Sequence, residues 1–271
     1  MTSRRGIVLG LMMGEILLGL VTGSQASKAD AGSGPYGNVC CAYNAVKHAV
    51  VVEAMSYVAG KTNVELWAPT TVLDQELGEA SAWVQASPTS YSVELYPTNR
   101  RHYPVNQADG DFETITHQIG EWGAYVQGTP HEWHGGPNAA LKWPCRWGHN
   151  CRAAGKIAIT NSLTGELWKT DEGPSDITWT MGKWRIQCNA WPGPSVARAL
   201  ELSRQVLSQI RSYPLPGVAG TLFLSQAADG IPTIGTWQDG KTVIYVWGIS
   251  FYQAIPIISS MRPLRASELA R

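Results

Sequence analysis

The sequence predicts an α+β protein built on an antiparallel, hairpin-rich sheet with helices on one face. Three observations support this fold class. Short segments of alternating polar and apolar residues are separated by turn residues, as in β-hairpins. Two longer segments have the apolar spacing of amphipathic helices. The order strand, hairpin, helix occurs twice in the C-terminal half, which predicts two related units there.

Residues 1–26 have the three parts of a secretory signal in the expected order. Two arginines precede an apolar stretch, and Ser24-Gln25-Ala26 then places small residues at the positions that signal peptidase reads. Glu15 interrupts the apolar stretch, and a carboxylate is costly inside a membrane. The alternative interpretation is an uncleaved membrane anchor, for which the stretch is somewhat short. We expect a protein that is secreted or held in the cell envelope, with a membrane contact only if this segment stays uncleaved.

The composition excludes some partners. The formal net charge is +0, and no run of basic residues occurs. Nucleic acids and anionic membranes attract proteins with basic patches, so neither is expected as a partner. The remaining length suits one large domain or two small ones.

The N-terminal half begins with a small, polar lead-in over residues 27–39. The region 40–154 is expected to hold one helix and a β-hairpin. The helix is predicted over 41–59 and ends before Gly60. The strands are predicted over 81–86, 91–96 and 122–127. A long loop rich in Pro, Gly, His and Trp then follows over 128–154.

Residues 155–271 contain the repeated pattern. The first copy has a strand, a hairpin and a helix over 155–160, 176–188 and 195–211, the helix being capped by Ser195. The second copy has them over 220–225, 235–246 and from Ser250 onward, where Pro256 kinks or delays the helix. Both hairpins read W-x-x-G-K-x-x-I, beginning at Trp179 and at Trp237, with glycine where a tight turn needs positive φ. A sheet covered on one side leaves its other face as the natural binding surface.

Two segments resemble known exported proteins. The C-terminal run from Lys241 to Ser250, with Ala254, Ile257 and the ending Ser259-Ser260-Met261, is similar to the closing strand and helix of two groups. One is an uncharacterised domain of exported Gram-positive bacterial proteins, and the other is the lipoprotein-carrier-like half-barrels. Residues 64–73 also resemble a segment of the exported Gram-positive group. The resemblance implies a curved antiparallel sheet that holds an apolar ligand or lipid, and it implies no catalytic residue.

Five cysteines lie after the signal, which suits an oxidising compartment. Cys145 and Cys151 close a short loop and are the expected disulfide. Cys40 and Cys41 are neighbours that rarely pair with each other, so one of them is expected to reach Cys188, leaving one thiol over. His131, His134 and His149 lie near Cys145, but oxidised cysteines bind no metal and the spacing of a metalloprotease is absent, so we expect no metal site and no cofactor.

Tryptophan carries the main functional signal, with 12 residues against 3 phenylalanines. Seven of the tryptophans lie in segments with strand-like alternation: Trp83, Trp122, Trp168, Trp179, Trp184, Trp237 and Trp247. Core packing explains those in part. Trp133, Trp143 and Trp147 lie in the polar loop, where burial is less expected, and they are the candidate ligand-binding residues.

The sequence favours a non-enzymatic binding protein that holds an apolar or sugar ligand, such as envelope lipid or polysaccharide. No nucleophile elbow, phosphate-binding loop or dinucleotide fingerprint occurs. Two acidic groups, Asp109-Asp111-Glu113 and Asp171-Glu172-Asp176, are expected to be solvated turns, so no catalytic residue is assigned. The alternatives are a secreted hydrolase of cell-wall polymer, which would use carboxylates or the His131–His149 loop, and a structural surface protein.

Overall fold

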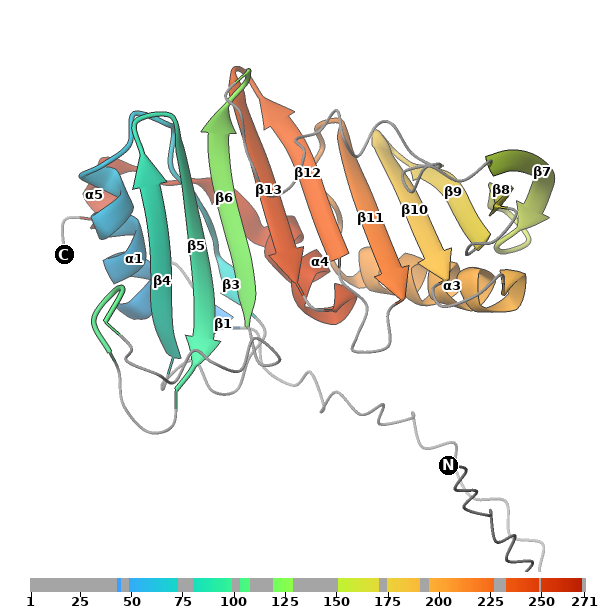
Figure 1. Ribbon diagram of the computed structural model, residues 1–271, viewed down its shortest axis with the longest axis horizontal. Helices are drawn as coiled ribbons and strands as arrows, with labels where there is room; N and C mark the ends of the chain where they lie inside the picture. Colours follow the sequence, from blue (N-terminus) through green and yellow to red (C-terminus); the bar gives the residue numbers. More distant parts are fainter. Residues whose placement is uncertain are drawn as a thin grey trace, which may run out of the picture. The chain divides into compact units, whose positions relative to one another are not determined.

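Ten strands form one open sheet in the order β4-β5-β6-β13-β12-β11-β10-β9-β8-β7 (Figure 1). The computed structural model describes residues 43–44, 49–72, 80–98, 103–107, 119–128, 151–170, 175–190, 195–226, 233–248 and 250–269, all within the unit Val39–Arg271. Neighbouring strands are antiparallel except β10 and β11, which are parallel. The predicted α+β class with a mostly antiparallel sheet is therefore confirmed.

The strands of this sheet have the following bounds: β4 Ala80–Ser87, β5 Ser90–Pro97, β6 Gly120–Val126, β7 Cys151–Ala158, β8 Thr164–Thr170, β9 Ser175–Met181, β10 Trp184–Ala190, β11 Gly220–Gln226, β12 Thr233–Asp239 and β13 Thr242–Gly248. Four short strands pair outside it: β1 Tyr43–Asn44 with β3 Thr71–Val72, and β2 Trp67–Pro69 with β14 Met261–Pro263. The β2–β14 pair brings together two segments that lie far apart in the sequence.

The predicted hairpins β4–β5, β9–β10 and β12–β13 are present. Gly182 and Gly240 turn the last two with φ of 59° and 56°, a backbone conformation that glycine adopts without steric cost. Trp179 lies opposite Ile186 in the first of these hairpins, and Trp237 lies opposite Ile244 in the second. The W-x-x-G-K-x-x-I pattern therefore has the same local meaning in both.

Helices α1 (Ala49–Ala59), α3 (Val196–Ser212) and α4 (Phe251–Ser260) lie behind the sheet as Figure 1 is drawn, and α5 (Ala266–Leu269) follows near the C-terminus. Ser195 caps α3 as predicted, since its side chain accepts a hydrogen bond of 3.3 Å from the Arg198 N–H. Pro256 lies inside α4. In the described part of the chain, no helix combines the length and the apolarity needed to span a membrane.

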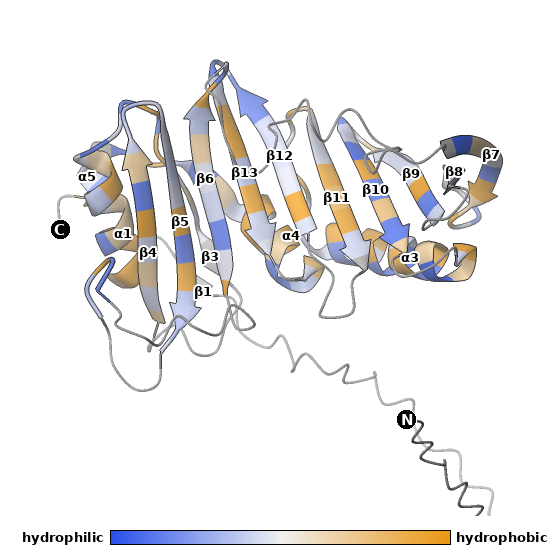
Figure 2. Ribbon diagram, viewed as in Figure 1, coloured by the Kyte–Doolittle hydropathy of each residue, from blue (hydrophilic) through white to orange (hydrophobic). Residues whose placement is uncertain are grey.

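One core cluster joins the helices to alternate residues of the strands. Hydrophobic and hydrophilic residues alternate along strands such as β4 and β10 (Figure 2). Val84, Trp122, Ile186, Leu222 and Ile244 are all buried in this cluster. Each large side chain buried in this way contributes about 1.5–3 kcal/mol, so the helix-covered face supplies most of the stability of the sheet.

Three sequence expectations were wrong in position. The helix predicted over 41–59 begins at Ala49, because Tyr43 and Asn44 pair with β3. The strand predicted over 155–160 is β7, which begins at Cys151 inside the predicted loop. In the first copy, the strand that pairs with the hairpin is β8, which was not predicted. Residues 155–158 pair with β8 instead of with the hairpin.

Both edges of the sheet are protected. Along β4, Asn106 accepts a 2.6 Å hydrogen bond from the Val84 N–H and donates a 2.8 Å bond to the Val84 carbonyl. Along β7, the register shifts at Gly155, whose φ is 106°, and Lys156 is exposed. A bulge and a charged side chain both discourage pairing with another chain.

Candidate ligand-binding face

The helix-free face consists of the strand residues that alternate with the core residues. The register of the ten strands aligns one residue from each strand into a row across this face, which we call the central row. In order from β4 to β7, the row is Trp83, Glu94, Glu121, Trp247, Ile234, Phe223, Gln187, Thr178, Glu166 and Lys156. At about 4.8 Å per strand, the row is about 43 Å long when measured along the sheet.

The β4 end of the row places two carboxylates between two indoles. Glu94 and Glu121 are direct cross-strand partners, and Trp83 and Trp247 are their outer neighbours. Among the described residues, Trp83 is the one large hydrophobic side chain that is exposed, with 40% of its surface accessible. Like charges placed directly opposite one another destabilise a sheet. Packing and stability alone therefore do not explain why both positions carry glutamate.

Tyrosines orient both carboxylates. The Tyr96 hydroxyl donates to Glu94 Oε2, and the Tyr245 hydroxyl donates a 3.2 Å bond to Glu121 Oε1. Burial, followed by the Glu121 carboxylate, raises the pKa of Tyr245 well above its ordinary value, so the phenol stays protonated as a donor. Tyr245 packs over Gly123, where an added Cβ would lie 2.6 Å from the phenol oxygen.

A buried polar network lies beside the row on β9, β10 and β11. Asp176 accepts hydrogen bonds from Asn189 Nδ2 at 2.6 Å and from Gln187 Nε2 at 3.0 Å. The Ser225 hydroxyl donates to Asn189 Oδ1 at 3.2 Å. Burial raises the pKa of Asp176 to about 7, although the two amide bonds act in the opposite direction. The expectation that Asp176 lies in a solvated turn was therefore wrong, because it is a strand residue that is only 3% exposed.

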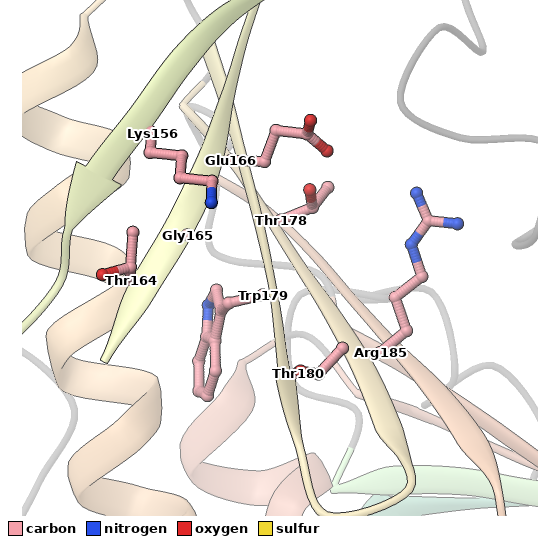
Figure 3. A pocket seen from close by; sticks show the side chains of 8 residues that line it. All are labelled: Lys156, Thr164, Gly165, Glu166, Thr178, Trp179, Thr180 and Arg185. Carbon is pink, nitrogen blue, oxygen red and sulfur yellow. The ribbon is translucent and has the colours of Figure 1, made fainter. Parts of the chain in front are cut away.

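The other end of the row opens into a pocket of about 410 Å³ (Figure 3). Its lining residues are Lys156, Thr164, Gly165, Glu166, Thr178, Trp179, Thr180 and Arg185. Glu166, Thr178 and Arg185 project from β8, β9 and β10 on the same side of the sheet (Figure 3). Lys156, Glu166 and Thr178 are also the last three members of the central row, so the row and the pocket are continuous.

The strand tryptophans are divided between the two faces. Trp122, Trp179, Trp184 and Trp237 are buried in the helix-side core together with Trp67. The ring of Trp237 lies 6.2 Å from that of Trp67 and 5.9 Å from that of Trp184. The remaining three expected strand positions, Trp83, Trp168 and Trp247, lie on the helix-free face. Core packing therefore accounts for four of the seven.

Cys188 carries a free thiol that is 0% exposed. Burial raises its pKa to about 12, so the thiol is neutral and unreactive. The expected disulfide from Cys40 or Cys41 to Cys188 is therefore wrong: Cys188 points into the core beneath α3, where the Ser203 hydroxyl and the Trp179 indole are its polar neighbours.

The other predicted site residues belong to the loop that was predicted over 128–154. Trp133, Trp143, Trp147, Cys145 and the histidines of the same loop lie outside the described residues, and Cys151 is described only as the first residue of β7. Within the described ranges, no group of His, Cys, Asp and Glu could hold a metal ion.

Sequence reasoning missed the central row and the pocket. Alternation along each strand was visible, but it does not say which strands are neighbours. Glu94 and Glu121 are separated by 26 intervening residues, and Glu121 and Trp247 by far more, so only the register brings them together.

Comparison with known proteins identifies no relative, because no family model, no curated protein and no solved structure matches this chain.

Proposed function

We propose that the protein is an exported binding protein whose helix-free face holds a saccharide of the cell envelope or its surroundings along the central row. The observation that carries this proposal is a row that places flat aromatic side chains beside hydrogen-bonding groups. Trp83 and Trp247 flank two carboxylates. The apolar Ile234 and Phe223 come next, and the amide of Gln187 and the hydroxyl of Thr178 follow them.

A sugar fits this pattern better than a lipid does. A pyranose ring has an apolar face, which can stack on an indole, and a rim of hydroxyls, which need donors and acceptors. A lipid chain would remove water from the two carboxylates and add no hydrogen bond to those that Tyr96 and Tyr245 already donate. Removing water from a charged group is costly, which disfavours a lipid here. The apolar part of the row, Trp247 to Phe223, has carboxylates on one side and Gln187 on the other, so it does not form the continuous apolar groove that a lipid carrier needs.

The test is binding of the purified mature protein to a panel of envelope polysaccharides, peptidoglycan and lipid vesicles. Replacing Trp83 by Ala should weaken saccharide binding about tenfold, since a stacked and desolvated indole contributes roughly 1–3 kcal/mol. Trp83→Phe should retain part of the affinity. Tyr252→Ala in α4 is the control, because it removes a half-buried aromatic ring on the helix side.

Equal retention of saccharide by the wild type and Trp83→Ala, or binding to vesicles alone, would overturn the proposal.

Trp133 and Trp147 are proposed to contribute to binding of the same ligand. Their double replacement by Ala should cause a further loss of affinity without any change in circular dichroism.

Hydrolysis of a polysaccharide is the second candidate function. The opposed pair Glu94 and Glu121 supports it, because cross-strand partners have Cβ atoms about 4.5–5.5 Å apart, which allows the carboxyl separations used by glycosidases. The Asp176 carboxylate is a poorer candidate, since both of its oxygens already accept amide hydrogen bonds. Release of reducing ends by the wild type, lost in Glu94→Gln and Glu121→Gln while binding persists, would establish hydrolysis.

We also infer that the strand, hairpin and helix units are related, with corrected bounds. The proposed units are β8–β9–β10–α3 and β11–β12–β13–α4, in each of which three antiparallel strands precede a helix. Superposing the hairpin at Trp179 on the hairpin at Trp237 should then superpose α3 on α4. Unrelated helix positions after that superposition would show that the W-x-x-G-K-x-x-I match is a coincidence.

A further inference from the structure

We propose that the pocket at the β7 end of the central row binds the oxyanion of an acidic saccharide, a carboxylate or a phosphate. This inference rests on the proposed function, because it names the class of saccharide that the same face would select. It is carried by the shape of the pocket, its charge and its supply of hydrogen-bond donors.

The pocket exists because the β8–β9 ladder stops early. The register pairs Trp168 with Asp176 and Glu166 with Thr178, but it gives Trp179 and Thr180 no partner in β8. The β9–β10 ladder continues to Met181. Strands β8 and β9 therefore separate beyond Thr178, and the space on this side of β9 is the cavity of about 410 Å³.

The charges of the pocket favour an anion. Lys156 from β7 and Arg185 from β10 line it together with one carboxylate, that of Glu166, so the lining carries one net positive charge. Lys156 and Glu166 are register partners, yet no ion pair joins them in the described structure. The exposed Lys156 ammonium therefore keeps its three donors for a ligand.

Hydroxyl groups add further donors. The Thr178 oxygen accepts a 3.1 Å hydrogen bond from the Trp168 indole N–H, which leaves the hydroxyl proton available to donate. Thr164 and Thr180 lie on the same lining. Ammonium, guanidinium and hydroxyl donors form short, charge-assisted bonds to a carboxylate or phosphate, whereas Glu166 can accept from a sugar hydroxyl.

The experiment compares a short oligogalacturonate with its fully methyl-esterified form, which has the same sugar backbone but no charge. Isothermal titration of the mature protein at low salt should show at least tenfold tighter binding of the acid. Lys156→Gln should reduce that preference to less than threefold, and Arg185→Gln should do the same. Lys183→Gln is the matched control, because Lys183 is an exposed lysine in the β9–β10 turn that does not line the pocket.

Two further variants separate this inference from the proposed function. Glu166→Gln should increase the affinity for the acid, since it removes the one negative charge of the pocket. Trp83→Ala should weaken the acid and the ester by the same factor. A phosphorylated neutral oligosaccharide tests phosphate as the source of the oxyanion, and its preference over the unphosphorylated form should also depend on Lys156.

Each outcome has one meaning. Equal affinity for charged and neutral forms, with both still dependent on Trp83, overturns the oxyanion pocket and leaves the saccharide face standing. A preference for the acid that survives in Lys156→Gln and Arg185→Gln also overturns the pocket, because it places the oxyanion elsewhere. No binding of any saccharide overturns the proposed function itself. If Arg185→Gln fails to fold by circular dichroism, the exposed Lys156 variant decides alone.

Discussion

At the scale of single residues, Asp176 ties the stability of the protein to pH. Its folded pKa of about 7 lies well above the value near 3.9 of an unfolded aspartate. Between about pH 4 and pH 7, the folded protein therefore holds a proton that the unfolded chain has already released. Since the folded state binds more protons, the free energy of unfolding decreases as the pH rises through this window and is constant above it.

We predict that Asp176→Asn removes this dependence. The free energy of unfolding of the wild type should decrease, relative to the variant, by roughly 2–4 kcal/mol between pH 4 and pH 8. Asparagine keeps an acceptor for Asn189, and the Gln187 amide can rotate to accept from the new side chain. Urea unfolding at several pH values measures the difference. Asp239→Asn at the exposed end of β12 is the control, and an identical pH profile in the wild type and Asp176→Asn would contradict the prediction.

Residue chemistry was only partly predictable from the sequence. Alternation correctly puts Trp83 and Trp122 on the opposite face of the sheet from the residues next to them in the chain. It cannot tell which of the two faces the helices cover. Asp176 follows a polar, acidic stretch and so looks like a turn residue. Its burial depends on Gln187 and Asn189 from the next strand, whose amide groups satisfy it.

At the scale of elements, the two equivalent hairpin turns allow a direct comparison. Gly182 and Gly240 both have positive φ, and an added Cβ would meet no atom within 4 Å at either position. Replacement by Ala should therefore cost only the backbone penalty, about 1–2 kcal/mol at each site. Asn, which tolerates this conformation better, should cost less.

Urea unfolding of the four turn variants tests this prediction. Gly217→Ala is the matched control, because Gly217 also has open space around it but lies outside the positive-φ region. Alanine there should be neutral or should stabilise the fold by about 0.4–1 kcal/mol. A loss at Gly217 as large as that at Gly182 would show that the turn conformation is not the cause.

Elements with strong local signals were predictable, and those defined by distant pairing were not. The hairpins β9–β10 and β12–β13 and the capped helix α3 follow from turn glycines, alternation and Ser195. Strand β8 escaped prediction because Thr-Gly-Glu-Leu-Trp-Lys-Thr has one apolar pair and an internal glycine. Gly165 is required by packing instead, since an added Cβ would lie 2.8 Å from Ile177 Cγ2.

At the scale of the whole sheet, the two proposed units contribute different chemistry to the helix-free face. With Trp179 matched to Trp237, the cross-strand pair Asp176–Asn189 corresponds to the pair Ile234–Trp247. One half of the face is therefore polar and the other apolar at equivalent places. This division suits a ligand whose uncharged rings lie over the Trp247 half and whose charged group reaches the pocket beside Thr178.

The parallel β10–β11 junction joins these halves, and the core beneath it predicts that they unfold together. One hydrophobic cluster extends from Val50 in α1 through Trp122 to Val206 in α3, without a break at the junction. A continuous core of this kind favours a single cooperative transition. Tryptophan fluorescence and far-UV circular dichroism should therefore give the same urea midpoint for the protein.

Leu222→Ala tests the junction directly. Leu222 in β11 is fully buried on the helix side, so its truncation should reduce the free energy of unfolding by about 2–5 kcal/mol. Because the core is shared, the whole transition should move to lower urea and stay single. Leu163→Ala, at a half-buried position between β7 and β8, should cost less. Two separate transitions in Leu222→Ala, with fluorescence and circular dichroism reporting different midpoints, would show that each half holds its own core and that the parallel pair only tethers them.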